Sequence, residues 1–175
     1  NNKEEIKGAL KALSNATYDY VENKNAVVRS GGIEAVLAIL LSTGDNLDVQ
    51  RECLRLFRNL TDYSAEVRSR LCRDGVLQAA INCMGRSREH PGVAEHAIAF
   101  ILNLLSDMHD GGTPILQIDK QTLTEYVQVS IDHFPQNDQI QLHGQELIAA
   151  LKRLKAKESP ENNLSSMHIV DRLRS

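Results

Sequence analysis

The sequence predicts an all-α fold built from stacked helical repeats, and three observations support that prediction. A short apolar phrase that ends in asparagine recurs every 44 residues, at Asn15, Asn59 and Asn103. A second apolar phrase follows a glycine turn, first at Gly32 and again at Gly75. Apolar residues also recur at helical spacing along most of the chain. A fixed period in this range is typical of proteins in which each unit packs against its neighbours.

The helical spacing is clearest from Val49 to Leu60, where arginine and glutamate occupy the positions between apolar residues. Such a pattern is typical of a helix that buries one face. Strand-like alternation is absent over any useful length. Taken in order, we expect helices at residues 3–17, 24–30, 33–43, 47–62, 65–73, 76–86, 91–108, 120–134 and 138–157.

Residues that favour caps and turns mark the ends of these helices. Asn46 is suited to cap the helix that begins near residue 47, and Pro91 is suited to a first helical turn. Gly31 and Gly75 follow short helices, where glycine permits the left-handed turn into the next helix. Each unit is therefore a short helix, a glycine turn, a medium helix and a long helix that ends in the asparagine phrase.

These units divide the chain into a repeat domain at 1–158 and a hinge with a short helix or tail at 159–175. Because the first repeat starts midway, we interpret the chain as a fragment or a processed product. Three roles are open for the tail: it covers the end of the stack, it folds back onto a binding groove, or it is mobile. The expected repeats are a partial one at 1–20, full ones at 21–63 and 64–110, and an irregular one at 111–158.

Composition excludes several classes of function. The net charge of −3 is too small to favour nucleic-acid or membrane binding through a long-range field. No apolar run approaches the ~20 residues of a membrane-spanning helix. The chain has no Trp and few other aromatic residues, so it lacks the stacking platforms of single-strand nucleic-acid binders. Its three cysteines suit a reducing compartment, which favours a cytoplasmic location and leaves a nuclear one open.

Catalytic and metal-binding patterns are missing from the sequence. We find no nucleophile with a plausible base, no glycine-rich phosphate loop and no paired carboxylates. The cysteines do not have zinc-finger spacing, and the six histidines are scattered. The sequence therefore predicts a protein that is not an enzyme and that holds no cofactor and no metal.

The two interleaved phrases resemble the armadillo-repeat family over about residues 3–155. The most specific parts are the glycine turns at 31–32 and 75 and the phrases that end at the three asparagines. The resemblance implies a right-handed superhelical solenoid of about four repeats, with the first and last incomplete or irregular. The sequence departs from the family pattern at 111–122, which lacks the short helix and glycine turn, and at Ala150, which replaces the asparagine.

A binding face follows from the same resemblance. In similar proteins the long third helices line a concave surface, where the asparagines hold the backbone of an extended partner peptide. A carboxamide suits this role because it offers both a donor and an acceptor. The alternative is that each asparagine stabilises the end of its helix or meets solvent. The candidate peptide-binding residues, on and beside the asparagine stripe, are Lys11, Asn15, Arg51, Arg55, Arg58, Asn59, His96 and Asn103.

The hydrophobic core does not need the candidate binding residues, because other positions of the asparagine phrases supply its apolar side chains. We expect a small buried residue at the first position of each phrase, including Cys53, and a larger one four positions later. These two stripes are Ala9, Cys53 and Ala97, and Leu13, Phe57 and Ile101.

The leading function is an interaction scaffold or adaptor that binds an extended segment of a partner protein. Because the candidate row is basic at its amino-terminal end, an acidic peptide is the favoured ligand. The nuclear-signal carriers of this family place Trp four residues before the asparagine, where this chain has Lys11, Arg55 and Ala99; a basic nuclear signal is therefore disfavoured. The alternative is a regulator of a nucleotide-handling partner, similar to chaperone exchange factors or small-GTPase-binding domains.

Overall fold

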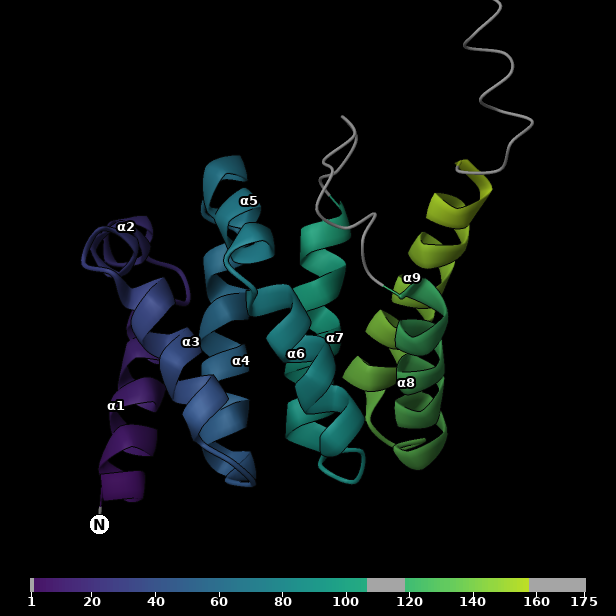
Figure 1. Ribbon diagram of the computed structural model, residues 1–175, viewed down its shortest axis with the longest axis horizontal. Helices are drawn as coiled ribbons and strands as arrows, with labels where there is room; N and C mark the ends of the chain where they lie inside the picture. The colour runs from purple at the N-terminus through teal and green to yellow at the C-terminus, as the bar shows by residue number, and fades with distance from the viewer. Residues whose placement is uncertain (1, 107–118, 158–175) are drawn as a thin grey trace, which may run out of the picture.

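The computed structural model describes residues 2–106 and 119–157, which form nine α-helices and no strand (Figure 1). Each expected helix is present within a few residues of its predicted bounds. The predicted tail at 159–175 and most of the irregular segment at 111–122 lie outside the described residues, and the division into repeats stays a prediction. The helices are α1 (Asn2–Thr17), α2 (Val21–Arg29), α3 (Gly32–Ser42), α4 (Leu47–Thr61), α5 (Ala65–Arg73), α6 (Val76–Arg86), α7 (Pro91–Ser106), α8 (Lys120–His133) and α9 (Asp138–Lys157).

Local signals explain where several helices begin. The Asn46 side chain accepts a hydrogen bond from the backbone N–H of Val49, as the sequence predicts for an N-cap. Gly31 and Gly75, which precede α3 and α6, have φ angles of 77° and 87°. These left-handed conformations favour glycine, because a side chain would strain the backbone there. The glycine turns are therefore confirmed.

The long helices α1, α4, α7 and α9 form one row, in which α1 packs on α4, α4 on α7, and α7 on α9. A second layer covers one side of this row: α3 packs on α4, α6 on α7, and α8 on α9. The short helices α2 and α5 precede α3 and α6 and lie near the end of the stack that the view shows at the top (Figure 1). The molecule is thus a line of helical units, each packed mainly on its neighbours.

A continuous apolar core runs between the two layers. Its largest side chains, Phe57 and Phe100, are fully buried, with ring centroids 6.2 Å apart. Cys53 and Ala97 are also fully buried, as predicted for small core residues. The prediction is wrong for Ala9, which is exposed. Among the described residues, α1 has a long-helix neighbour on one side only, so this position has nothing to pack against.

Among the described residues no single helix is long and apolar enough to cross a bilayer, although α2 and α3 together reach that length and composition with a 74° bend between them.

Candidate functional site

The row of long helices presents a polar surface on the side that the second layer leaves uncovered. We call it the polar face and define it by Lys7, Lys11 and Asn15 of α1, Arg51, Arg55 and Arg58 of α4, and Glu95, His96 and Asn103 of α7. All of these side chains are exposed or half-buried. The structure therefore brings seven of the eight candidate residues onto one surface, and the eighth, Asn59, lies beneath it.

The three asparagines join neighbouring helices. The amide nitrogen of Asn59 donates to the backbone carbonyl of Ser14 at 2.8 Å, near the end of α1. The amide nitrogen of Asn103 donates to the hydroxyl oxygen of Thr61 at 3.0 Å, at the end of α4. Asn15 instead accepts a hydrogen bond of 2.6 Å from the Arg55 guanidinium. Each bond joins two neighbouring long helices, so the asparagines help to hold adjacent repeats together.

This geometry changes what the asparagines can offer to a ligand. Asn59 has only 6% of its surface exposed, and its donor is engaged inside the molecule. Asn103 is half-buried, and Asn15 is exposed. Asn59 binds a backbone carbonyl near the end of α1, which is the long helix before its own, so this bond joins two long helices. Hydrogen bonding of unpaired carbonyls at a helix end is a general stabilising device.

The arginines of α4 surround a buried carboxylate that the sequence-based expectation placed outside the core. Glu52 is 3% exposed, and one of its carboxylate oxygens accepts from Arg51 Nε and Nη2 at 3.1 and 3.0 Å. The other oxygen lies 3.5 Å from Arg55 Nη1 but has no hydrogen-bond partner among the described residues. A buried carboxylate is costly unless it is paired. The arginines at positions 51 and 55 are the one signal in the sequence that could have indicated it.

Ion pairs also engage the first basic residues of the polar face. Lys7 lies 3.0 Å from a carboxylate oxygen of Glu4 and 3.2 Å from one of Asp48. The hydrogen bond to Glu4, followed by that to Asp48, raises the pKa of Lys7, and the bond from Lys7 lowers the pKa of Asp48. Within the described part of the chain, the side chains of Lys11 and Arg58 have no ion-pair or hydrogen-bond partner. They are the cations that remain available to a ligand.

His96 lies where α4 and α7 meet, with 14% of its side chain exposed. Its Nδ1 is 3.9 Å from a Glu95 carboxylate oxygen and has no hydrogen-bond partner among the described residues. Burial lowers the pKa of His96 to about 4, and Arg58 and Arg55 act in the same direction, while Glu95 and Glu52 oppose them. The imidazole is therefore neutral at neutral pH.

Reactive side chains and metal ligands form no recognisable site in the described residues. Burial raises the pKa of Cys53 to about 12 and that of Cys72 to about 11, which makes both thiols poor nucleophiles. No group of three His, Cys, Asp or Glu side chains in the described ranges is arranged to hold a metal ion.

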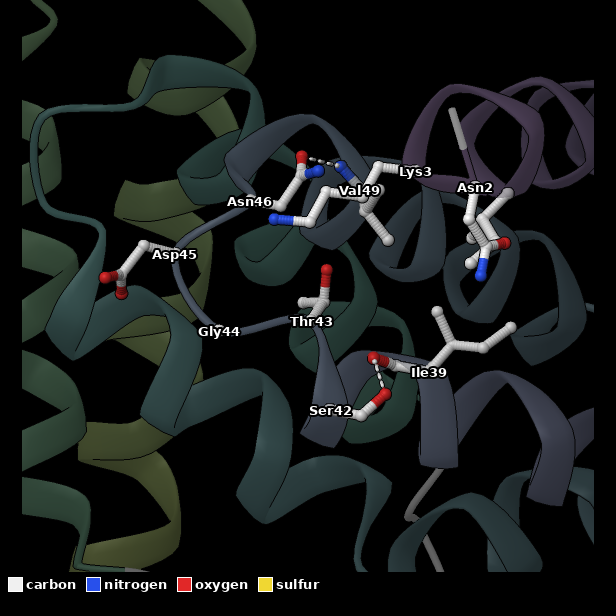
Figure 2. A pocket seen from close by; sticks show the side chains of 10 residues that line it. Asn2, Lys3, Ile39, Ser42, Thr43, Gly44, Asp45, Asn46 and Val49 are labelled. Atoms are coloured by element: carbon white, nitrogen blue, oxygen red, sulfur yellow. Dashed lines mark hydrogen bonds between the residues drawn. The ribbon is translucent and has the colours of Figure 1, made fainter.

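A separate hollow of about 880 Å³ lies between the start of α1 and the loop that joins α3 to α4 (Figure 2). Ile6, Ile39 and Val49 form its apolar side, and the loop from Thr43 to Asn46 forms its polar side. None of the candidate binding residues lines it. It is therefore distinct from the polar face.

Comparison with known proteins identifies one segment. Residues 21–62, which span α2, α3 and α4, match the Armadillo/beta-catenin-like repeat family. No curated protein and no solved structure matches the chain. The matched segment contains Arg51, Arg55, Arg58 and Asn59, and it ends where α4 ends.

Proposed function

Since the chain is an armadillo-repeat protein with an all-α solenoid fold, we propose that it is an interaction scaffold that binds an extended segment of a partner protein along the polar face. Solenoids of this kind offer long surfaces, because each unit adds the same helix face to a continuous row. The observation that carries the proposal is this row, in which α1, α4 and α7 present polar side chains beside one another.

The spacing of the helices suits an extended ligand. Packed helices lie about 8–10 Å apart, and an extended chain advances about 3.3 Å per residue. A partner segment that crosses the row would therefore meet a new helix at about every third residue. This arrangement allows residues of the partner at regular intervals to be recognised by successive helices.

Charge favours an acidic stretch over α1 and α4. Lys11 and Arg58 have no ion-pair partner in the described part of the chain, and Arg55 shares its charge between Glu52 and the Asn15 amide. The carboxylates farther along the row are Glu95 on α7 and the exposed Glu146 on α9. Binding would thus depend on the cations of the first two long helices, with Asn15 as the exposed polar neighbour.

Charge reversal of the two unpaired cations tests the proposal. Lys11→Glu and Arg58→Glu remove no side-chain bond to another described residue, whereas substitution of Arg55 would also break its contacts with Asn15 and Glu52. Arg73→Glu is the matched control, because Arg73 is an exposed residue in the last turn of α5, as Arg58 is in the last turn of α4. The three variants therefore place a negative charge at comparable sites, on or away from the polar face.

The measurement is the affinity of a fluorescent oligoglutamate peptide at low and at high salt. We expect each polar-face variant to weaken binding several-fold and to flatten the salt dependence, since one cation contact with the peptide is lost. The control should bind as the parent chain does. Unchanged affinity in both polar-face variants would show that the acidic segment does not lie on α1 and α4.

A further inference from the structure

The contact between α4 and α7 contains an unusual group of five ionisable side chains. We call it the α4–α7 cluster and define it as Glu52, Arg55 and Arg58 of α4 with Glu95 and His96 of α7. We infer that this cluster binds a carboxylate of the partner segment together with a proton, which His96 takes up. The inference rests on the proposed function and adds to it the chemistry and the pH dependence of one contact.

Unsatisfied polar atoms mark the cluster as incomplete. One oxygen of the buried Glu52 carboxylate and Nδ1 of His96 lack hydrogen-bond partners among the described residues. A buried polar atom without a partner destabilises the fold and calls for an explanation. Arg58, on the same surface, has no ion-pair partner in the described ranges. The cluster thus combines an unused cation with polar groups that their own fold leaves unpaired.

The charge balance explains why a proton should accompany the ligand. With His96 neutral, the two arginines and the two carboxylates of the cluster cancel. Next to it, the two cations Lys7 and Arg51 are matched by the two carboxylates Glu4 and Asp48. A bound carboxylate adds one negative charge to a partly buried group. Protonation of His96 restores neutrality, and an added negative charge nearby favours the imidazolium form.

Charged groups on two helices shift the pKa of His96. Besides burial, they are Glu95 on α7 itself and Glu52, Arg55 and Arg58 on α4. These four charged groups, all on α4 or α7, are the ones with the largest influence on His96. From the α8–α9 turn, Asn137 donates to a Glu95 oxygen at 3.3 Å, which holds that carboxylate beside the next repeat. The two arginines are therefore the charges that a ligand carboxylate would offset.

Reciprocal linkage between peptide and proton predicts how the affinity for the peptide should change with pH. A ligand carboxylate at Arg58 would raise the pKa of His96, so peptide and proton would favour each other's binding. Affinity should increase as pH falls from about 7.5 to about 5.5, a range in which glutamate side chains remain mostly ionised. Without His96 this increase should disappear.

The experiment measures oligoglutamate affinity at both pH values in the parent chain, in His96→Gln and in His143→Gln. His143 is the matched control, because its Nδ1 is likewise buried without a hydrogen-bond partner among the described residues, and it holds the corresponding position on α9. We expect tighter binding by severalfold at the lower pH in the parent and in His143→Gln, and equal affinities in His96→Gln. Loss of the pH effect in His143→Gln instead would overturn the assignment to His96.

A second measurement follows the His96 ring by NMR in the whole chain, so that it does not depend on the His96 variant folding. Adding oligoglutamate, or replacing Arg58 by Gln, should raise the pKa of His96, since each reduces the nearby positive charge. A His96 titration that does not change with saturating peptide overturns the inference. Binding that is equal at both pH values also overturns it but leaves the proposed function intact, whereas no binding at either pH would reject both.

Discussion

The contact between α1 and α4 and the contact between α4 and α7 occupy equivalent places in the repeat but are built differently. Polar bonds join α1 to α4: Lys7 pairs with Asp48, Arg55 binds Asn15, and Asn59 binds the Ser14 carbonyl. Apolar packing dominates between α4 and α7, where Phe57 meets Phe100. One periodic pattern therefore supports two kinds of interface.

The difference follows from how many neighbours each helix has. α4 and α7 lie between other long helices and bury large side chains on both sides, among them Leu56 and Phe100, which are fully buried. At the position equivalent to Leu56, α1 has Ala12, which is exposed. α1 buries Leu10 and packs Ile6 and Leu13 against the core, and hydrogen bonds and ion pairs at its edge add to this smaller apolar contact. Such polar contacts stabilise less than a filled core but orient the helix more specifically.

The largest predicted loss of stability comes from disrupting the apolar contact between α4 and α7. Phe57→Ala should lower the free energy of unfolding by about 3–5 kcal/mol, because it removes a fully buried ring and leaves a cavity. Leu13→Ala, the equivalent change on α1, should cost about 1–2 kcal/mol, since Leu13 is half-buried and part of its surface is already in water. Urea unfolding followed by circular dichroism measures both. Equal losses would mean that the two interfaces do not differ in apolar packing.

Acid should weaken the α4–α7 contact through His96. Its pKa is about 4 in the folded chain and 6.5 ordinarily, so the unfolded chain binds this proton more readily. The contribution to stability is complete above about pH 6.5 and is lost as pH falls toward about 4, by up to about 3 kcal/mol. Unfolding measured across this range should be steeper with pH in the parent than in His96→Gln. Parallel pH profiles would contradict the assignment.

The loss of stability on replacing each asparagine by alanine should follow how buried that asparagine is, although all three hold the same position in the repeat. Asn59→Ala leaves the Ser14 carbonyl without its buried donor and should cost about 1–3 kcal/mol. Asn103→Ala should cost about 0.5–1.5 kcal/mol, because the bond to the Thr61 hydroxyl is half-buried. Asn15→Ala, at an exposed site, should stay within about 0.5 kcal/mol. Equal thermal shifts in all three variants would argue against these inter-repeat bonds as their main structural role.

The smallest effect should come from the ion pair between Lys7 and Asp48. Lys7→Gln removes the hydrogen bond that lowers the pKa of Asp48, so this pKa should rise toward its ordinary value. Any loss of thermal stability should be slight, be visible at low salt and vanish at high salt, because the pair lies at the surface, half-buried, and is screened by salt. NMR titration of the Asp48 carboxyl and melting at two salt concentrations are the measurements. An unchanged Asp48 pKa would show that the pair does not form in solution.

Much of the local structure could be predicted because its causes are local. The helical spacing from Val49 to Leu60 became α4, and Asn46 caps it. Gly31 and Gly75 adopt the predicted left-handed turns. The burial of Cys53 also followed from its place in the phrase. The exposure of Ala9 did not, because the same phrase position is buried only where another helix covers it.

The sequence by itself determined the helices, their turns and the period that places three asparagines at matching positions. Only the tertiary structure decided what each asparagine binds, since a hydrogen bond between repeats depends on the helix that lies opposite. Asn59 and Asn103 contact the preceding repeat, whereas Asn15 accepts from Arg55 of the next one. Tertiary packing also buried Glu52 and left His96 beside arginines. The repeat period determines which side of its helix a residue occupies, and the residues packed opposite determine its burial and its hydrogen-bond partners.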